Sequence, residues 1–120
     1  MKIISVLIIL AVSLSFLSGC GRTGQYGTIQ GIEKVTPLKD ILSSPEKYEG
    51  KTVKVEGKIV EECPTGCWFN LADDGGIIYV DTNPGEFAIP QEVGKKASAE
   101  GTVVLKDGNV SIAGKGVEIK

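Results

Sequence analysis

Two tight turns constrain the fold of this chain most strongly, because together they fix how three consecutive segments between Lys51 and Asp81 pair. The segment Pro64–Gly66 has proline where a turn favours a fixed φ and glycine where a turn needs a left-handed residue, which predicts a three-residue hairpin loop. The segment Asp74–Gly75 predicts a two-residue turn into the next strand. We therefore expect three antiparallel strands that follow one another along a sheet.

The register that these turns impose separates the side chains of the three strands onto two faces. The first turn predicts four cross-strand pairs: Cys63 with Cys67, Glu62 with Trp68, Glu61 with Phe69, and Ile59 with Leu71. The second turn predicts four more: Trp68 with Asp81, Asn70 with Tyr79, Phe69 with Val80, and Leu71 with Ile78. One face then carries the apolar side chains and is expected to line the core: Val53, Val55, Ile59, Phe69, Leu71, Ile78 and Val80. The other face is polar and aromatic: Lys54, Glu56, Lys58, Glu62, Trp68, Asn70, Tyr79 and Asp81.

The segment before the first strand predicts a short helix. Apolar side chains at Leu38, Ile41 and Leu42 lie on one side of a helix that Thr36–Pro37 can begin. The segment Pro45–Tyr48 predicts one further helical turn.

Further glycine and proline positions complete the strand pattern. Gly57 predicts a bulge or a sharp bend in the first strand. Beyond Asn83–Gly85, which breaks the sheet, residues 97–105 and 110–119 predict two more strands joined by a turn at Asp107–Gly108. The chain is therefore expected to be all-β, with five strands and one short N-terminal helix.

The start of the chain has the pattern of an export signal. Lys2 precedes an apolar run of 14 residues, Ile3–Phe16, which is shorter than the 20 or so that a membrane span needs. The segment Leu17–Cys20 follows directly and resembles the lipobox of prokaryotic lipoproteins, in which the cysteine receives lipid and becomes the new N-terminus. The resemblance implies that residues 1–19 are a signal peptide and that Cys20 is lipidated. An ordinary cleaved signal and a short anchor are the alternatives.

These features divide the chain into three parts. Residues 20–34 are expected to form a flexible tether, because the segment from Gly21 to Gly31 has four glycines and no hydrophobic periodicity. Residues 35–120 are expected to form a single domain. The protein is then exported and anchored by lipid to the cell membrane or the outer membrane.

The expected domain is similar to a known barrel fold. Five strands with a curled first strand, a connector between the third and fourth, and a final hairpin match a Greek-key OB-fold barrel. Residues 37–60, PLKDILSSPEKYEGKTVKVEGKIV, resemble the opening of small bacterial and archaeal OB-fold domains that are grouped with anticodon-binding-like OB domains. The motif CPTGCW, Cys63–Trp68, resembles an uncharacterised family of exported OB-fold proteins. The resemblance implies an OB-fold but transfers no ligand.

The cysteine pair Cys63 and Cys67 has three possible roles. Opposed Cβ atoms in an antiparallel ladder are about 4.5–5.5 Å apart, close to the 3.5–4.5 Å or so of a disulfide, which favours a structural disulfide. Thiol exchange is the second possibility, although redox motifs usually place C-x-x-C at the start of a helix. The third is a metal site. Two thiolates can hold a soft ion such as Cu(I), whereas zinc needs further ligands from Glu61, Glu62, Asp73 or Asp74.

The outer face presents a candidate ligand-binding patch formed by Trp68, Asn70 and Tyr79. OB-folds commonly bind ligands on the second and third strands, which carry these residues. The alternative is that Trp68 packs under the N-terminal helix or the tether. The nearby charges are mainly acidic, so a glycan, a small molecule or a protein partner suits the patch better than nucleic acid does.

Composition and motifs favour a binding module over an enzyme. The chain has no histidine, which excludes imidazole metal sites and histidine bases. The chain has 13 basic and 15 acidic residues, and loss of residues 1–19 removes one basic residue, Lys2. The net charge is then −3, which argues against a nucleic-acid partner. No nucleophile–base pair, phosphate-cradling loop or dinucleotide motif is present. We expect a non-enzymatic, lipid-anchored envelope module. The alternative is thiol-redox or metal handling through Cys63 and Cys67, and nucleic-acid binding comes third.

Overall fold

The computed structural model describes residues 24–120. Its elements are β1 (Gly24–Gly27), α2 (Leu38–Ser43), α3 (Pro45–Tyr48), β2 (Thr52–Glu62), β3 (Trp68–Asp73), β4 (Gly76–Asp81), η2 (Asn83–Gly85), β5 (Lys96–Lys106) and β6 (Asn109–Ile119). The predicted signal peptide and the lipidation site Cys20 lie outside the described residues. In the part that is described, no helix has the length and apolar character needed to cross a membrane.

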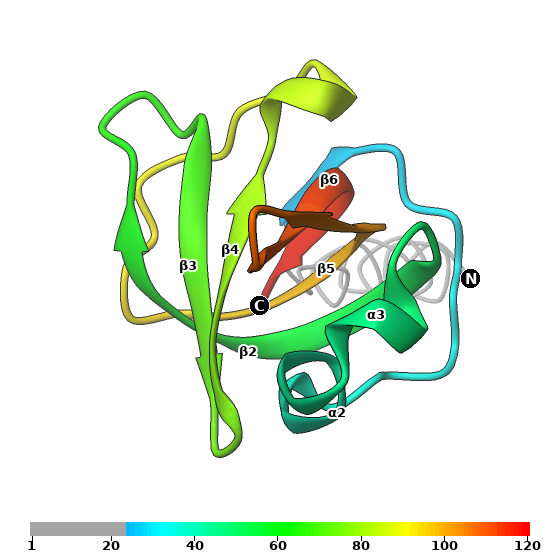
Figure 1. Cartoon of the computed structure of the whole chain (residues 1–120). Helices are drawn as coiled ribbons and strands as arrows, with labels where there is room; N and C mark the ends of the chain where they lie inside the picture. Colours follow the sequence, from blue (N-terminus) through cyan, green and yellow to red (C-terminus); the bar gives the residue numbers. More distant parts are fainter. Residues whose placement is uncertain (1–23) are drawn as a thin grey trace, which may run out of the picture.

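Five of the strands close into a barrel (Figure 1). Strand β2 pairs with β3, β3 with β4, β4 with β6, β6 with β5, and β5 pairs again with β2. Every neighbouring pair is antiparallel except β4 and β6, which run parallel. The all-β, five-stranded, OB-fold-like barrel predicted from the sequence is therefore confirmed.

Strand β2 belongs to two walls of the barrel because it bends in its middle. Residues 52–58 pair with β5, and the strand pairs with β3 from Lys58 onward. Gly57 lies at this changeover, and a Cβ there would overlap the carbonyl oxygen of Ala72 in β3. Glycine is required here because the two backbones approach too closely for a side chain. The bend therefore lies at the glycine that predicts it.

The predicted register is confirmed across the second turn and partly wrong across the first. Trp68 lies opposite Asp81 and Asn70 opposite Tyr79, as expected. Ile59 and Leu71 also pair as predicted.

Beyond Ile59 the ladder between β2 and β3 shifts by one residue. Glu61 pairs with Asn70 instead of Phe69, and Glu62 pairs with Phe69 instead of Trp68. The cause is a β-bulge, which inserts one extra residue into one strand of the pair. Glu62 consequently leaves the outer face, and its carboxylate accepts a hydrogen bond from the backbone N–H of Glu92 at 3.0 Å.

The apolar face predicted for the three strands forms the core. Its seven members are all at most 6% exposed: Val53, Val55, Ile59, Phe69, Leu71, Ile78 and Val80. Strands β5 and β6 add further buried side chains, among them Val103 and Ile112. Helix α2 packs against β4 and places Leu38 and Ile41 in the core with no exposed surface.

Helix α2 begins differently from the prediction. Pro37, not Thr36, is the capping residue, and it provides no side-chain hydrogen bond. The carboxylate of Asp73 accepts the first free backbone N–H, that of Leu38, at 3.3 Å. A residue distant in sequence therefore replaces the local cap, and this contact ties α2 to the end of β3.

The segment predicted to be a flexible tether is part of the fold from Gly24 onward. Strand β1 pairs with the last residues of β6, from Gly24 opposite Ile119 to Gly27 opposite Gly116. Strand β4 pairs with β6 only at residues 111–113, so the edge of β6 beyond them is open to β1. Glycine-rich composition gives flexibility only where the backbone lacks partners, and here the edge of β6 supplies them.

A buried carboxylate holds the residues that follow β1. Glu100 of β5 accepts hydrogen bonds from the backbone N–H groups of Gln30, Gly31 and Ile32 at 2.8, 3.2 and 3.1 Å. Glu100 lies on the outward side of β5, but residues 30–32 cover it, and it is only 2% exposed. The tether prediction is therefore wrong for this segment as well.

Replacement of Glu100 tests this anchoring. Glu100→Ala removes one acceptor for three donors, so we expect the free energy of unfolding to fall by about 1.5–3 kcal/mol, the range for hydrogen bonds to a charged group. Amide hydrogen exchange at Gln30, Gly31 and Ile32 should accelerate more than exchange in the barrel. Glu118→Ala is the control, because among residues 24–120 the Glu118 carboxylate accepts a hydrogen bond only from the exposed side chain of Gln25. Unchanged exchange at all three amides would contradict the assignment.

Candidate ligand-binding face

Strands β3 and β4 present the candidate site on their outer face because their side chains alternate. Phe69 and Leu71 point into the core, so their neighbours Trp68 and Asn70 point outward. Tyr79 lies directly opposite Asn70 and shares this face. The structure therefore brings together the three residues that the sequence singles out, Trp68, Asn70 and Tyr79.

The rings of Trp68 and Tyr79 stack on each other. Their centroids are 5.5 Å apart and the ring planes are inclined by 26°. The two residues are diagonal neighbours across the β3–β4 ladder, a spacing that aromatic side chains can bridge. Trp68 is half-buried and Tyr79 is 39% exposed. The pair thus forms an open aromatic surface.

Polar groups surround the aromatic pair. The amide Nδ2 of Asn70 donates a hydrogen bond to Oε2 of Glu61 at 3.2 Å. Asp81 lies opposite Trp68, and its Oδ1 accepts the backbone N–H of Asn83 at 3.0 Å. Glu61 joins this face only because of the bulge in β2, and the sequence contains no signal that would have placed it there.

Strand β6 continues the face with small side chains. Ser111 lies opposite Tyr79, and Ala113 lies opposite Asp81. Neither side chain is large enough to cover the tyrosine ring, so the surface beside it stays open. The outer-face positions at these pairs carry carboxylates, an amide, a hydroxyl and two aromatic rings, and none of them is basic.

The environment of Tyr79 keeps its phenol protonated. Burial raises the pKa of Tyr79, and the nearby negative charge of Asp81 raises it further. The hydroxyl is therefore a neutral hydrogen-bond donor throughout the neutral pH range.

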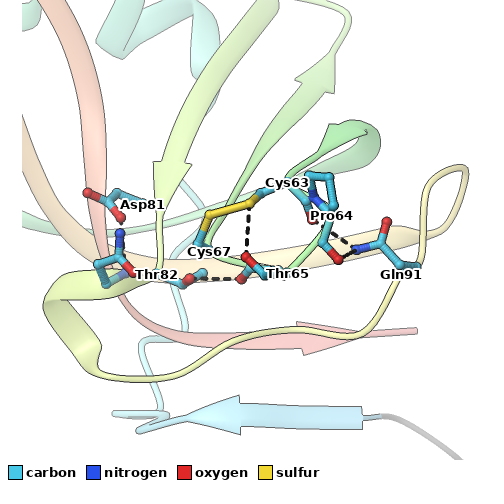
Figure 2. The surroundings of a disulfide bond; sticks show 9 residues. Cys63, Pro64, Thr65, Cys67, Asp81, Thr82 and Gln91 are labelled. Atoms are coloured by element: carbon cyan, nitrogen blue, oxygen red, sulfur yellow. Dashed lines mark hydrogen bonds between the residues drawn. A yellow bond between two sulfur atoms is a disulfide. The ribbon is translucent and has the colours of Figure 1, made fainter.

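The loop between β2 and β3 is closed by a disulfide that joins Cys63 and Cys67 (Figure 2). Their Cα atoms are 5.6 Å apart, and the predicted disulfide is confirmed. The fully buried Thr82 donates its hydroxyl to the carbonyl oxygen of Gly66 at 2.9 Å, and the side chain of Gln91 donates to that of Cys63 at 2.9 Å. Trp68 follows Cys67 directly, so the disulfide and these hydrogen bonds hold the backbone of Trp68 in position.

The disulfide also bears on the metal-binding alternative. The two sulfur atoms are bonded to each other, so neither is a free thiolate ligand in this oxidised form. Residues 24–120 contain no group of three or more cysteine, aspartate or glutamate side chains placed to hold a metal ion. Among the other suggested ligands, Asp73 uses both carboxylate oxygens to accept backbone N–H groups, those of Leu38 and Gly75. A metal at this pair would first need the disulfide to be reduced.

Comparison with known proteins identifies the fold. No family model and no curated protein matches this chain. Among solved structures, the hypothetical protein YgiW from E. coli is similar with 22% identity and a TM-score of 0.53, over 78% of this chain and 99% of that one. A protein assigned as an aspartyl-tRNA synthetase from Leishmania major Friedlin is similar with 16% identity and a TM-score of 0.54. This second match covers 77% of the present chain but 21% of the synthetase chain.

The chain has an OB-fold. Sequence identities this low establish the fold alone, so neither neighbour transfers a ligand or an activity. In an OB-fold the face formed by the second and third barrel strands is a common ligand site. Those strands are β3 and β4 here, so the aromatic pair lies on that face.

The pKa of Tyr79 gives a test of this electrostatic description. Asp81→Asn should lower the pKa of Tyr79 only partly toward its ordinary value, because burial is the larger cause of the shift. The folded protein holds this proton more tightly than the unfolded chain does. The resulting stability is fully present below pH 10 or so and is lost as the pH rises through the folded-state pKa.

The measurement is an NMR titration of the Tyr79 ring carbons, combined with the free energy of unfolding as a function of pH. The control is Asp107→Asn at the β5–β6 turn, which should leave the Tyr79 titration unchanged. An unchanged titration in Asp81→Asn would show that the carboxylate does not act on the phenol.

Removal of the disulfide tests its structural role. Cys63→Ser/Cys67→Ser should lower the free energy of unfolding by roughly 2 kcal/mol, the chain-entropy value for so short a loop. Urea denaturation measures this change. Mass spectrometry of the intact protein should show a gain of two hydrogen atoms on reduction and no bound metal. A metal-containing mass without reductant would instead support the metal-handling alternative.

Proposed function

We propose that this protein is a non-enzymatic binding module, held by lipid at Cys20 in the cell envelope, and that the outer face of β3 and β4 holds its ligand. The observation that carries the proposal is the exposed Trp68–Tyr79 stack. Exposed aromatic clusters with a few convergent polar groups are typical of binding surfaces. Here those polar groups are the Asn70 amide and the Asp81 carboxylate.

The charge of this face supports an uncharged or cationic ligand. Glu61 and Asp81 both border the aromatic pair, and they would repel the phosphates of a nucleic acid. A glycan or another small hydroxylated molecule can lie against the rings while its hydroxyl groups bond to the amide and the carboxylates. A cationic group can interact with both the ring faces and the carboxylates. A protein surface with these groups is also compatible with the site.

Two observations support the envelope location. The segment Leu17–Cys20 has the lipobox pattern. The disulfide between Cys63 and Cys67 is of the kind that persists in oxidising compartments such as the bacterial periplasm. Lipidation is measured directly as acyl chains on Cys20 in the mass spectrum of the N-terminal peptide.

Binding can be followed through Trp68, the only tryptophan in the chain. The full chain in neutral detergent is titrated with neutral and cationic oligosaccharides and with single-stranded oligonucleotides at low salt, while tryptophan fluorescence is recorded. We expect a change with an oligosaccharide, and we expect Tyr79→Ala to weaken that binding about tenfold, the equivalent of about 1.4 kcal/mol. Stability should change by less than about 1 kcal/mol because Tyr79 is partly exposed.

The control variant is Val93→Ala, since Val93 is 58% exposed and lies outside β3 and β4. It should leave the oligosaccharide affinity unchanged. Binding that is insensitive to Tyr79→Ala would place the site elsewhere. Submicromolar affinity for the oligonucleotide would overturn the assigned ligand class in favour of nucleic acid.

A further inference from the structure

A second surface feature lies beside the bend of β2. It is a hollow of about 430 Å³ lined by three lysines, Lys58, Lys96 and Lys120, and by three carboxylates, those of Glu56, Asp73 and Asp74. Small-molecule sites commonly have volumes of about 300–1,000 Å³, so a lipid headgroup can fit in it. We call it the lysine hollow.

Two of the lysines, Lys58 and Lys96, occupy paired positions on neighbouring strands, and both side chains are exposed. Lys58 of β2 lies directly opposite Lys96 of β5. Like charges at such positions destabilise a sheet. Within the described part of the chain, neither lysine forms an ion pair. Solvent screens much of this repulsion because both side chains are exposed, and an anion bound between them would remove what is left.

The carboxylates of the hollow do not supply that anion. Asp73 is engaged by the backbone N–H groups of Leu38 and Gly75. Glu56 lies 3.9 Å from Lys120, and both side chains are almost half exposed, so this ion pair is weak. Asp74 is an exposed residue of the β3–β4 turn. Among the described residues, Lys58 and Lys96 are thus left without a carboxylate within ion-pair distance.

The lysine hollow lies next to the point where the described chain begins. Gly24 pairs with Ile119, which also pairs with Ala97. The backbone N–H of Lys120 donates to the carbonyl oxygen of Lys96 at 2.9 Å. The chain from Cys20 to Gly24 spans at most about 14 Å when fully extended. A lipid on Cys20 would thus hold this end of the barrel at the membrane surface.

We propose that the lysine hollow binds the phosphate of an anionic lipid headgroup and so orients the barrel against its membrane. The orientation rests on the lipid anchor of the proposed function, whereas the recognition of phosphate does not. Lysine binds phosphate as a point charge. Clustered lysines close to an anionic membrane add attraction that weakens with salt. The acyl chains provide attachment, and the hollow selects which side of the barrel faces the lipid.

Lysine footprinting tests the proposal on the full chain. The protein is reconstituted in vesicles of phosphatidylcholine alone and in vesicles that contain phosphatidylglycerol, and acetylation of each lysine is followed by mass spectrometry. We expect Lys58 and Lys96 to react at least about threefold more slowly in the phosphatidylglycerol vesicles, and we expect added salt to reverse the protection. Lys51 and Lys106 are exposed and lie outside the hollow, so they serve as internal controls.

Soluble probes separate the lipid headgroup from free phosphate. In neutral detergent, glycerophosphoglycerol should shift the backbone amide signals of Gly57 and Ala97. The shifts should vanish in Lys58→Gln/Lys96→Gln and persist in the control Lys51→Gln/Lys106→Gln, which removes the same charge. A response to inorganic phosphate alone, without protection in vesicles, would overturn the assignment to lipid. No response to either probe and no protection would overturn the anion site itself.

Failure of the anchor is measured independently. If Cys20 carries no acyl chains but Lys58 and Lys96 are still protected in anionic vesicles, the lipid anchor of the proposed function fails and the headgroup site stands. If Cys20 is acylated and neither lysine is protected, the anchor stands and the headgroup site fails.

Discussion

The close approach of β2 and β3 at Gly57 is the contact on which the rest of the structure depends. A strand can belong to two walls of a small barrel only if it bends, and a bend brings the backbone of its neighbour close. At Gly57 that neighbour is the carbonyl oxygen of Ala72, which occupies the space of a side chain. Without this contact β2 could not pair with both β3 and β5, and the barrel would remain open.

Closure of the barrel determines what kind of site this protein can build. Each of the five barrel strands is paired along part of both its sides, and β1 extends the pairing of β6. The edges left for strand addition are short, among them the outer side of the four-residue β1, which favours recognition by side chains of the outer face. The disulfide and the Thr82 hydroxyl brace the loop before Trp68, and this bracing positions one half of the aromatic pair.

The sequence predicts those parts of the fold that depend on short turns. The β3–β4 pairs follow from the Asp74–Gly75 turn, which is why the sequence places Trp68, Asn70 and Tyr79 on one face. The bulge between Ile59 and Glu61 could not be predicted, because the glycine that predicts a bulge or a bend is Gly57, where the strand bends, and no such signal marks the bulge itself. The same limit applies to residues 24–32. Their glycine content indicates flexibility, whereas their partners, β6 and Glu100, lie about 70 residues or more away in the sequence.

The arrangement of charges on the surface also could not be predicted from the sequence. A net charge of −2 suggests a surface without affinity for anions, but it is a sum over positions. Lys58 and Lys96 occupy paired positions only through the β2–β5 register, and no turn joins those strands to predict this register. Ala72 lies opposite Lys58 and two positions from Asn70, so the lysines and the aromatic pair belong to one continuous outer surface. An acidic aromatic patch and a hollow of mixed charge with two paired lysines therefore lie side by side, and a single net charge describes neither.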